Sequence, residues 1–335
     1  MHDTISDTSK RAAATRHKPD VKRQAGALLA RFWGVRGSHP VVGSGGSRVG
    51  VNTSCVELRW GRHVVLLDAG SGLIPLGERL GGEWRERRVA DPSVSVLFTH
   101  AHHDHLCGLP FFAPLFTPEA RVHLLGPDLA GMRFPDILHG YMRSPYFPVD
   151  LADVPAHCSV RTVAGGTRLV WAPDADGPVI WGSSAAVPES SLVVDVFHAR
   201  AHPRDGTLVY RATAGGRSLA FATDMEMDGA ASELERGFVR FVRGVDVLIH
   251  DAQYSAADYD GPSPRRGFGH STPDMAGRIA RTAEAGELVL FHTDPDYGDG
   301  EVTALEVAAR AVFPRARAAR EGAEIWLDAA GVRHV

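Results

Sequence analysis

The segment THAHHDHLCG contains four side chains that can bind metal ions: His100, His102, Asp104 and His105. It directly follows the apolar run SVSVLF (93–98), which is typical of a buried β-strand. Side chains two residues apart on an extended chain point the same way, so His100 and His102 can bind one ion together. We expect Asp104 and His105 at the start of a helix, facing a second ion. Imidazole and carboxylate ligands together suit Zn²⁺, Mn²⁺ or Fe²⁺.

Three later polar residues also stand directly beyond apolar runs: His202, Asp224 and His292. Two-metal sites need more ligands than the first motif supplies, and they usually include a bridging carboxylate. Side chains at the ends of neighbouring strands converge, so these residues can complete the set. The sequence therefore predicts seven metal ligands at one edge of the strands.

The elements that would position these ligands are mostly strands. Apolar runs predict strands at 28–35, 55–60, 63–70, 93–98, 121–126, 192–197, 207–212, 218–223, 245–250 and 287–292. Gly61 and Arg62 separate two of these runs, which indicates a hairpin. Helical patterns fit 106–116, 230–242, 272–285 and 301–312. Strands come first and later alternate with helices, which favours two sheets covered by helices.

The composition is that of a globular protein, with 44% hydrophobic and 23% charged residues among 335. A formal net charge of −4 disfavours a protein that coats nucleic acid, because that task needs a broad Lys/Arg surface. The three cysteines form no CxxC pair, so we expect neither a disulfide framework nor a thiolate zinc site. The sequence contains no signal-like start and no apolar run of bilayer length. We therefore expect a cytoplasmic protein with no membrane partner.

The positions of apolar patterns along the chain indicate the domain organisation. Residues 1–25 are polar and mixed in charge, so we expect a disordered tail. Residues 26–335 are expected to form a single domain. The segment 128–190 is rich in Pro, Gly and aromatic residues, and we interpret it as an insertion or lid within that domain.

The motifs together resemble the metallo-β-lactamase superfamily. They are most similar to its branch of phosphoribosyl cyclic phosphodiesterases and cyclic-nucleotide phosphodiesterases, which are relatives of the tRNA 3′-processing endonuclease. The resemblance covers about residues 30–312 and rests on FWGVRGSHP, NTSCVEL, LLDAGSGL, THAHHDH, PYFPV, ATDME, LIHDAQY, GHST and LFHTDP. It implies an α/β (α+β) fold, the αββα sandwich of two mixed β-sheets flanked by helices.

The resemblance also implies how the ligands divide between two divalent ions. One ion would be bound by His100, His102 and His202, the other by Asp104, His105 and His292, with Asp224 as the bridge. Zn²⁺ is expected first, and the oxygen ligands keep Mn²⁺ and Fe²⁺ open. Asp68, after the run HVVLL, resembles the aspartate that supports the metal-binding loop. A homodimer is expected by resemblance alone.

Further residues are implied to act on a phosphate. His270 lies just before an expected helix that begins at Thr272 and Pro273. By the resemblance, His270 contacts the phosphate and protonates the departing oxygen, and Asp251 orients it. Tyr146 and Phe147, in the motif PYFPV, are expected to form part of a lid or pocket wall that contacts the substrate.

We therefore expect a dinuclear metal-dependent phosphodiesterase that hydrolyses a small cyclic phosphodiester, such as a cyclic nucleotide or ribose cyclic phosphate. A metal-bridging hydroxide would attack phosphorus, Asp104 and Asp224 would orient it, and His270 would assist the leaving alkoxide. Extended nucleic acid is not the expected partner, since no basic arm is visible.

Several alternatives remain open at this point. An RNA-processing nuclease, or a lactone, thioester or lactam hydrolase of a biosynthetic pathway, would use the same fold. An iron-dependent oxygenase would need fewer ligands than the seven present. A binding protein that has lost catalysis would not require the complete ligand set or His270.

Overall fold

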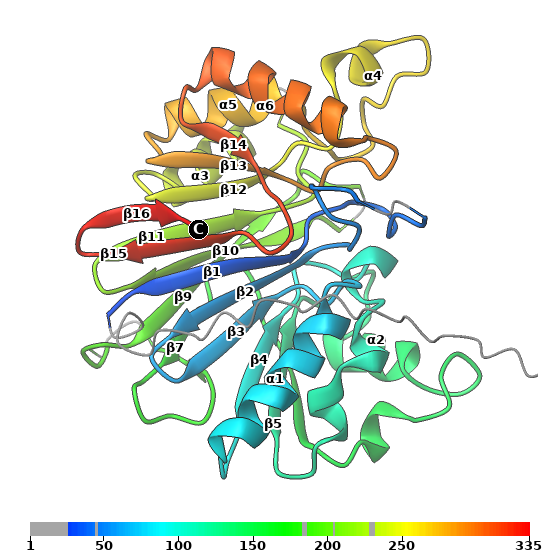
Figure 1. Ribbon diagram of the computed structural model, residues 1–335, viewed down its shortest axis with the longest axis vertical. Coiled ribbons are helices and arrows are strands. Elements are labelled where there is room, and N and C mark those ends of the chain that lie inside the picture. The colour runs from blue at the N-terminus through cyan, green and yellow to red at the C-terminus, as the bar shows by residue number, and fades with distance from the viewer. Residues whose placement is uncertain (1–25, 44–45, 183–185, 204, 228–231) are drawn as a thin grey trace, which may run out of the picture.

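The computed structural model describes residues 26–43, 46–182, 186–203, 205–227 and 232–335. The expected tail at 1–25 lies outside the described residues. Two eight-stranded sheets lie one against the other, with helices on the two outer faces (Figure 1). This arrangement confirms the sandwich of two mixed sheets that the sequence predicts. Among the described residues, no helix combines the length and the apolar character needed to cross a membrane.

The first sheet contains the strands that lead to the metal motif. Its order is β16 (Gly331–His334), β15 (Glu324–Asp328), β1 (Leu28–Gly34), β2 (Cys55–Trp60), β3 (His63–Leu67), β4 (Ser93–Leu97), β5 (Arg121–Gly126) and β6 (His157–Thr162). Strands β2 and β3 form the expected hairpin, because Trp60 pairs with His63 across Gly61 and Arg62. From β3 to β6 all pairings are parallel, so the carboxyl ends of these strands share one edge.

The second sheet supplies the later ligands. Its order is β14 (Ala316–Ala318), β13 (Glu287–Phe291), β12 (Val247–Asp251), β11 (Arg217–Ala222), β10 (Thr207–Ala214), β9 (Leu192–Ala199), β7 (Arg168–Trp171) and β8 (Val179–Ile180). Strands β11, β12 and β13 run parallel to each other. Their carboxyl ends therefore lie together at one edge, as the sequence pattern predicts.

Three layers of apolar side chains hold the sandwich together. The middle layer joins the facing sheets, and the Phe32 ring lies 6.2 Å from that of Phe291. The two outer layers pack helices against sheets. The helices are α1 (Leu73–Arg87) and α2 (Phe134–Tyr141) on the first sheet, and α3 (Glu233–Phe241), α5 (Pro273–Thr282) and α6 (Asp299–Val312) on the second, with the short α4 (Ala256–Asp260) in a loop (Figure 1). The three cysteines are free thiols.

The helix expected at 106–116 does not form. The chain instead makes separate 3-10 turns at His103–His105, Leu109–Phe111 and Ala113–Phe116. Pro110 and Pro114 lack the amide hydrogen that a continuing helix needs, so the segment breaks into short turns. Asp104 and His105 therefore sit in a single 3-10 turn instead of at the start of a longer helix.

The segment 128–190, interpreted from sequence as an insertion, contributes to both sheets. Strand β6 pairs with β5 at one edge of the first sheet, and β7 pairs with β9 in the second. Helix α2 packs on the first sheet through Phe134 and Leu138. A role of this segment as a lid stays a prediction.

Sharp turns at the strand ends orient three of the expected site residues. Asp68, Asp224 and His292 have φ angles of 62°, 53° and 61°, in the left-handed region that residues other than glycine rarely adopt. Each such conformation costs about 1–3 kcal/mol and persists only where surrounding contacts enforce it. The turns redirect the chain at the same edge of the two sheets.

Candidate metal centre

Four side chains form a first group of ligand atoms that all lie within 4.8 Å of one another: His100, His102, His202 and Asp224. His202 Nε2 is 3.1 Å from His102 Nδ1. Asp224 Oδ2 lies 3.5 Å from His100 Nε2 and 3.8 Å from His202 Nε2. The residues follow β4, β9 and β11, so both sheets contribute to this group.

A second group contains Asp104, His105 and His292. His292 Nε2 lies 3.1 Å from Asp104 Oδ2 and 3.2 Å from His105 Nε2. Asp224 reaches this group as well, because its Oδ1 is 3.2 Å from His105 Nε2 and 3.3 Å from His292 Nε2. One carboxylate oxygen of Asp224 thus faces each group, as a bridging ligand requires. The structure brings together all seven side chains that the sequence suggests as ligands.

The histidine nitrogens that face away from the ligand groups have polar partners. His105 Nδ1 lies 2.8 Å from Asp68 Oδ2, and His202 Nδ1 lies 3.0 Å from the Gly269 carbonyl oxygen. His292 Nδ1 lies 3.0 Å from Gln253 Oε1. Such partners fix the ring orientation and the tautomer, so Nε2 of each ring is available to a metal ion.

Electrostatics differ between the two groups. Burial lowers the pKa of His100, His102 and His202, so these rings are neutral and have a free lone pair at neutral pH. Burial alone would also lower the pKa of His105, but the surrounding Asp104, Asp224 and Asp68 carboxylates raise it. Three carboxylates around one ring favour positive charge at this position, which a bound divalent ion would supply in place of the proton.

The two key carboxylates are held in their charged form. Burial alone would raise the pKa of Asp104, but His105 and His292 lower it well below its usual range. For Asp224, burial is likewise outweighed by His292, His105 and His100. Both carboxylates are therefore ionised at neutral pH, as metal ligands must be.

The donor set fits two divalent ions, and a buried atom supports this. His100 Nε2 is fully buried and has no hydrogen-bond partner among the described residues, although it points at Asp224. Leaving a buried polar atom unpaired costs about 1–3 kcal/mol. A metal ion bound between His100 and Asp224 would satisfy this nitrogen.

His270 lies beside both groups and is 7% exposed. Its Nδ1 is 2.7 Å from Asp251 Oδ2, and its ring stacks on His292 with centroids 5.0 Å apart. Burial alone would lower the pKa of His270, but the Asp251 carboxylate outweighs it and raises that pKa to about 9. The imidazole therefore carries a proton at neutral pH, and its Nε2 remains free of Asp251.

The loop that carries His270 is fixed by Glu226. This carboxylate accepts hydrogen bonds from the backbone N–H of Gly267 at 2.8 Å and of Gly269 at 2.9 Å. Gly269 has a φ of +89°, and a Cβ there would lie 2.4 Å from His202 Nδ1. Only glycine can therefore bring this loop so close to the metal ligand.

Residues 63–293 match the family described as the beta-lactamase superfamily domain, which is more than half of the chain. The chain belongs to the metallo-β-lactamase superfamily. It is a hydrolase of that fold, and the fold implies divalent metal ions.

The superfamily relatives include ribonucleases. The chain is 25% identical over 327 residues to the ribonuclease Z of Gemmatimonas aurantiaca, covering 90% of this chain and 96% of that one. It is 31% identical over 252 residues to the ribonuclease Z of Synechococcus sp. WH7803, covering 65% and 75%. Among solved structures, the metallo-beta-lactamase fold protein YhfI from Bacillus subtilis has a TM-score of 0.57 at 20% identity, covering 92% of this chain and all of that one.

In this superfamily member, the two aromatic residues expected to contact substrate lie on an outer surface. Tyr146 is 80% exposed, and the half-buried Phe147 packs edge-on against Phe111 at 5.6 Å. Tyr141 comes nearer the metal motif, because its hydroxyl lies 3.2 Å from His103 Nδ1. A substrate contact of Tyr146 or Phe147 stays a prediction.

Sequence reasoning missed several residues that support the ligands. The Ser38 backbone N–H donates to Asp104 Oδ2 at 2.8 Å, and Gln253 contacts His292 as described above. Thr99 donates from its backbone N–H to Asp68 Oδ1 at 2.7 Å. All three lie inside motifs that carry the family resemblance, namely FWGVRGSHP, LIHDAQY and THAHHDH. Membership of these motifs is the sequence signal that could have identified them.

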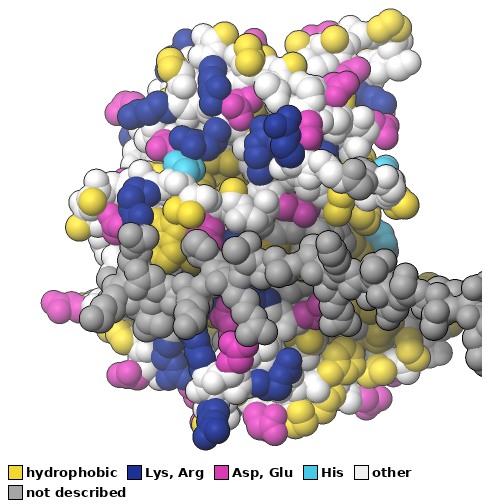
Figure 2. All heavy atoms as spheres, viewed as in Figure 1, with side chains coloured by type: hydrophobic (Ala, Val, Ile, Leu, Met, Phe, Trp, Pro, Cys, Tyr) yellow, Lys and Arg dark blue, Asp and Glu magenta, His cyan; other side chains and the backbone are white. Residues whose placement is uncertain are grey.

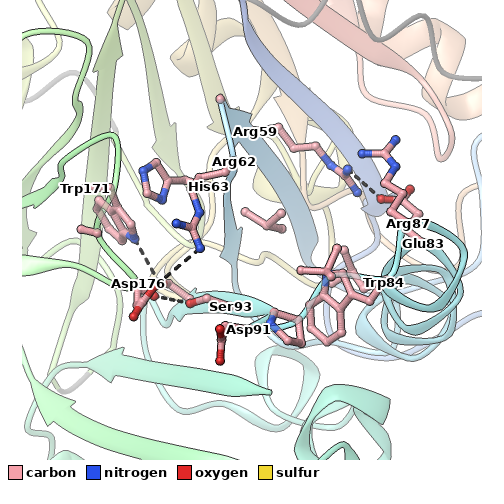
Figure 3. Close-up of a pocket in the computed structure, with 17 residues that line it drawn as sticks. Arg59, Arg62, His63, Glu83, Trp84, Arg87, Asp91, Ser93, Trp171 and Asp176 are labelled. Carbon is pink, nitrogen blue, oxygen red and sulfur yellow. Dashed lines mark hydrogen bonds and ion pairs between the residues drawn. The ribbon is translucent and has the colours of Figure 1, made fainter. Parts of the chain in front are cut away.

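A separate cavity of about 180 Å³ lies at the opposite ends of the strands from the metal centre. It includes His63 at the start of β3 and Ser93 at the start of β4, whereas the ligands follow the ends of these strands. Figure 3 shows Arg62 pointing towards Asp176 and Arg59 paired with Glu83. Two arginines of this cavity are thus paired with carboxylates of the same cavity.

Proposed function

We propose that this protein is a metal-dependent phosphodiesterase that cleaves RNA. The hydrolase class follows from the family, whereas the substrate is our proposal. The ribonuclease Z relatives, one of which aligns over nearly its whole length, support RNA. The acidic net charge of the chain favours a small cyclic phosphodiester over RNA. We give the relatives more weight, because net charge does not describe the surface around one site.

The first ligand group would hold one ion and the second group the other, with Asp224 between them. When bound, two divalent ions supply Lewis-acid polarisation of the phosphoryl oxygens and acidify water. Zn²⁺ is the proposed ion on ligand type, and Mn²⁺ or Fe²⁺ suits the same residues.

The side chains of the chain itself position the reactants and move protons. Asp104 and Asp224 are ionised, so they can accept hydrogen bonds from the attacking water and orient it. His270 is protonated and can donate its Nε2 proton to the departing oxygen. Asp251 holds the His270 ring in place through Nδ1 and stabilises its charge.

The pair of His270 and Asp251 is the observation that carries the phosphodiesterase part of this proposal, whereas the relatives carry the choice of RNA. A proton donor beside the ligand groups is needed when an alkoxide leaves phosphorus, since an alkoxide is a poor leaving group. Thioester hydrolysis has less need of such a donor, because a thiolate is a stable leaving group. The His270–Asp251 distance of 2.7 Å and the burial of both residues therefore favour the phosphodiester reaction over thioester hydrolysis.

A small cyclic phosphodiester is the second candidate, because the net charge of −4 and the mixed surface favour it. On the face shown in Figure 2, basic and acidic side chains are interspersed, and its described part shows no continuous basic field. A protein that binds long RNA by charge alone would need such a field. The described part of this face therefore offers no such field for long RNA.

The test is a substrate panel for the purified protein loaded with Zn²⁺ or Mn²⁺. It contains single-stranded and hairpin RNA, a set of cyclic nucleotides, a lactone and a thioester, with Asp224→Ala as the inactive control. Cleavage of RNA that the control lacks supports the proposal. Cleavage of cyclic nucleotides alone selects the second candidate, and turnover of only the lactone or thioester contradicts both.

A further inference from the structure

Arg265 is an exposed arginine held between two aromatic rings. Its guanidinium carbon lies 5.5 Å from the centroid of the Tyr254 ring and 5.8 Å from that of Phe268. Within the part of the chain that the structure describes, no carboxylate oxygen lies within 4.0 Å of this guanidinium. Stacking on aromatic rings and a hydrogen bond to the Tyr254 side chain restrict the Arg265 side chain, and its remaining N–H donors can bind a ligand.

Tyr254 connects Arg265 to the metal centre. The Tyr254 ring lies edge-on to His270 with centroids 5.7 Å apart. Gln253 Nε2 donates to the Tyr254 hydroxyl at 3.2 Å and to Ser38 Oγ at 3.1 Å. Ser38 is exposed and its N–H binds the ligand Asp104. Arg265 therefore stands one ring away from the proposed proton donor, at the exposed rim of the second ligand group.

The backbone around Arg265 is ordered by contacts within the protein. Its N–H donates to the Tyr259 carbonyl at 3.1 Å, and its own carbonyl accepts from Phe268 N–H at 3.1 Å. Glu226 anchors the following Gly267 and Gly269, as described above. Binding at Arg265 would thus incur little entropy cost for ordering the loop.

The neighbouring Arg266 provides a contrast. It pairs with Asp260 at 2.6 Å and lies over Tyr259 at 5.0 Å. Arg266 therefore forms a direct ion pair, whereas among the described residues Arg265 forms none and only lowers the pKa of the Asp258 carboxylate from a greater distance. The two residues share type, loop and exposure, so Arg266 is a matched control.

We propose that Arg265 binds a phosphate group of the substrate other than the one that is cleaved. A planar guanidinium donates two parallel hydrogen bonds to phosphate, and its fixed position at the rim suits a neighbouring phosphate on the same strand. This inference rests on the proposed function, because a substrate with a single phosphate offers no such group.

The test measures RNA binding separately from RNA cleavage. A fluorescent single-stranded RNA with phosphorothioate linkages keeps its negative charges and slows cleavage. Its Kd is measured by anisotropy, at several salt concentrations, for metal-loaded wild type, Arg265→Ala and Arg266→Ala. Thermal midpoint and metal content verify that both variants are folded and loaded.

We expect Arg265→Ala to weaken binding by about 3- to 10-fold, the effect of one exposed charged hydrogen-bonding group. The slope of log K against log salt should fall by about 0.7, which corresponds to one phosphate contact on a single strand. Arg266→Ala should change the Kd by less than about twofold.

Equal Kd values for wild type and Arg265→Ala would overturn the inference. Binding too weak to measure in both proteins would overturn it as well. An equal loss in Arg266→Ala would also overturn it, because the effect would then belong to the general charge of the loop. Failure of the proposed function is a separate result, namely RNA that wild type does not cleave when its linkages are unmodified.

Discussion

Replacing His270 with Ala tests the assignment of the proton donor. The side chain makes one hydrogen bond to Asp251 Oδ2. After its removal, the Asp251 carboxylate still accepts from three backbone N–H groups, those of Asp224 at 3.1 Å, Gln253 at 3.2 Å and Ser271 at 2.9 Å. None of the seven ligand side chains is changed. We therefore expect the variant to fold and to retain its metal ions.

The effect on catalysis depends on the leaving group. Loss of a general acid slows a reaction by about 10²–10⁴-fold when the departing oxygen needs a proton. RNA releases an alkoxide, so His270→Ala should lower kcat for RNA by about that factor. Bis(p-nitrophenyl) phosphate releases p-nitrophenolate, a stable anion that needs no proton. Its hydrolysis should therefore fall much less.

The assay compares kcat for both substrates with metal content determined by mass spectrometry. A variant that keeps its metal and loses RNA cleavage selectively supports the role of His270. RNA turnover within about threefold of wild type would refute it. An equal loss on both substrates accompanied by metal loss would show that His270 supports the metal centre instead of donating a proton.

Three further predictions concern the loop, the metal ions and the core. Glu226→Gln should lower kcat/KM for RNA about tenfold with unchanged metal content, because an amide replaces the charge-assisted acceptor of Gly267 and Gly269; unchanged kinetics would contradict this. Metal removal with EDTA should lower Tm by at least about 5 °C, and Zn²⁺ should restore it, because ions that bind only the folded state stabilise it; a constant Tm would count against a preformed centre. Phe221→Ala, in the layer between the sheets, should lower the free energy of unfolding in urea by about 3–5 kcal/mol. The exposed Val307→Ala should lower it by less than about 0.5 kcal/mol. Similar losses in both variants would disprove the assigned core.

The ligand set could be predicted because it depends on a local rule. Each ligand follows an apolar run, and strand ends in such a sheet converge. Asp224 and His292 lie far apart in the sequence, yet β11 and β13 place them 3.3 Å from each other. Which atom of each residue faces which group depends on the sharp turns, and no pattern in the sequence specifies these angles.

Helix α1 shows where the reading of the sequence failed. Leu73, Leu76 and Leu80 recur at helical spacing and are buried, so a signal was present. Gly77, Gly81 and Gly82 weaken the intrinsic helix preference of the same segment. A Cβ at Gly77 would lie 2.8 Å from the Phe112 ring, so close packing against that ring explains this glycine. Tertiary contact outweighs propensity here.

The edges of the first sheet also could not be predicted. Strand β1 pairs with β15, and Leu28 faces Leu327 across almost the whole chain. Such a pairing joins segments near opposite ends of the described chain, which local patterns do not encode. The short strands β14, β15 and β16 were missed for the same reason.

The most direct test of a two-metal phosphodiesterase is a metal titration of activity. Metal-free protein receives Zn²⁺ in steps, and the hydrolysis of bis(p-nitrophenyl) phosphate is measured against the number of ions bound per chain. We predict no activity without metal and a rate that reaches its maximum at about two ions. Full activity in the metal-free protein, or no hydrolysis with two ions bound, would contradict the account.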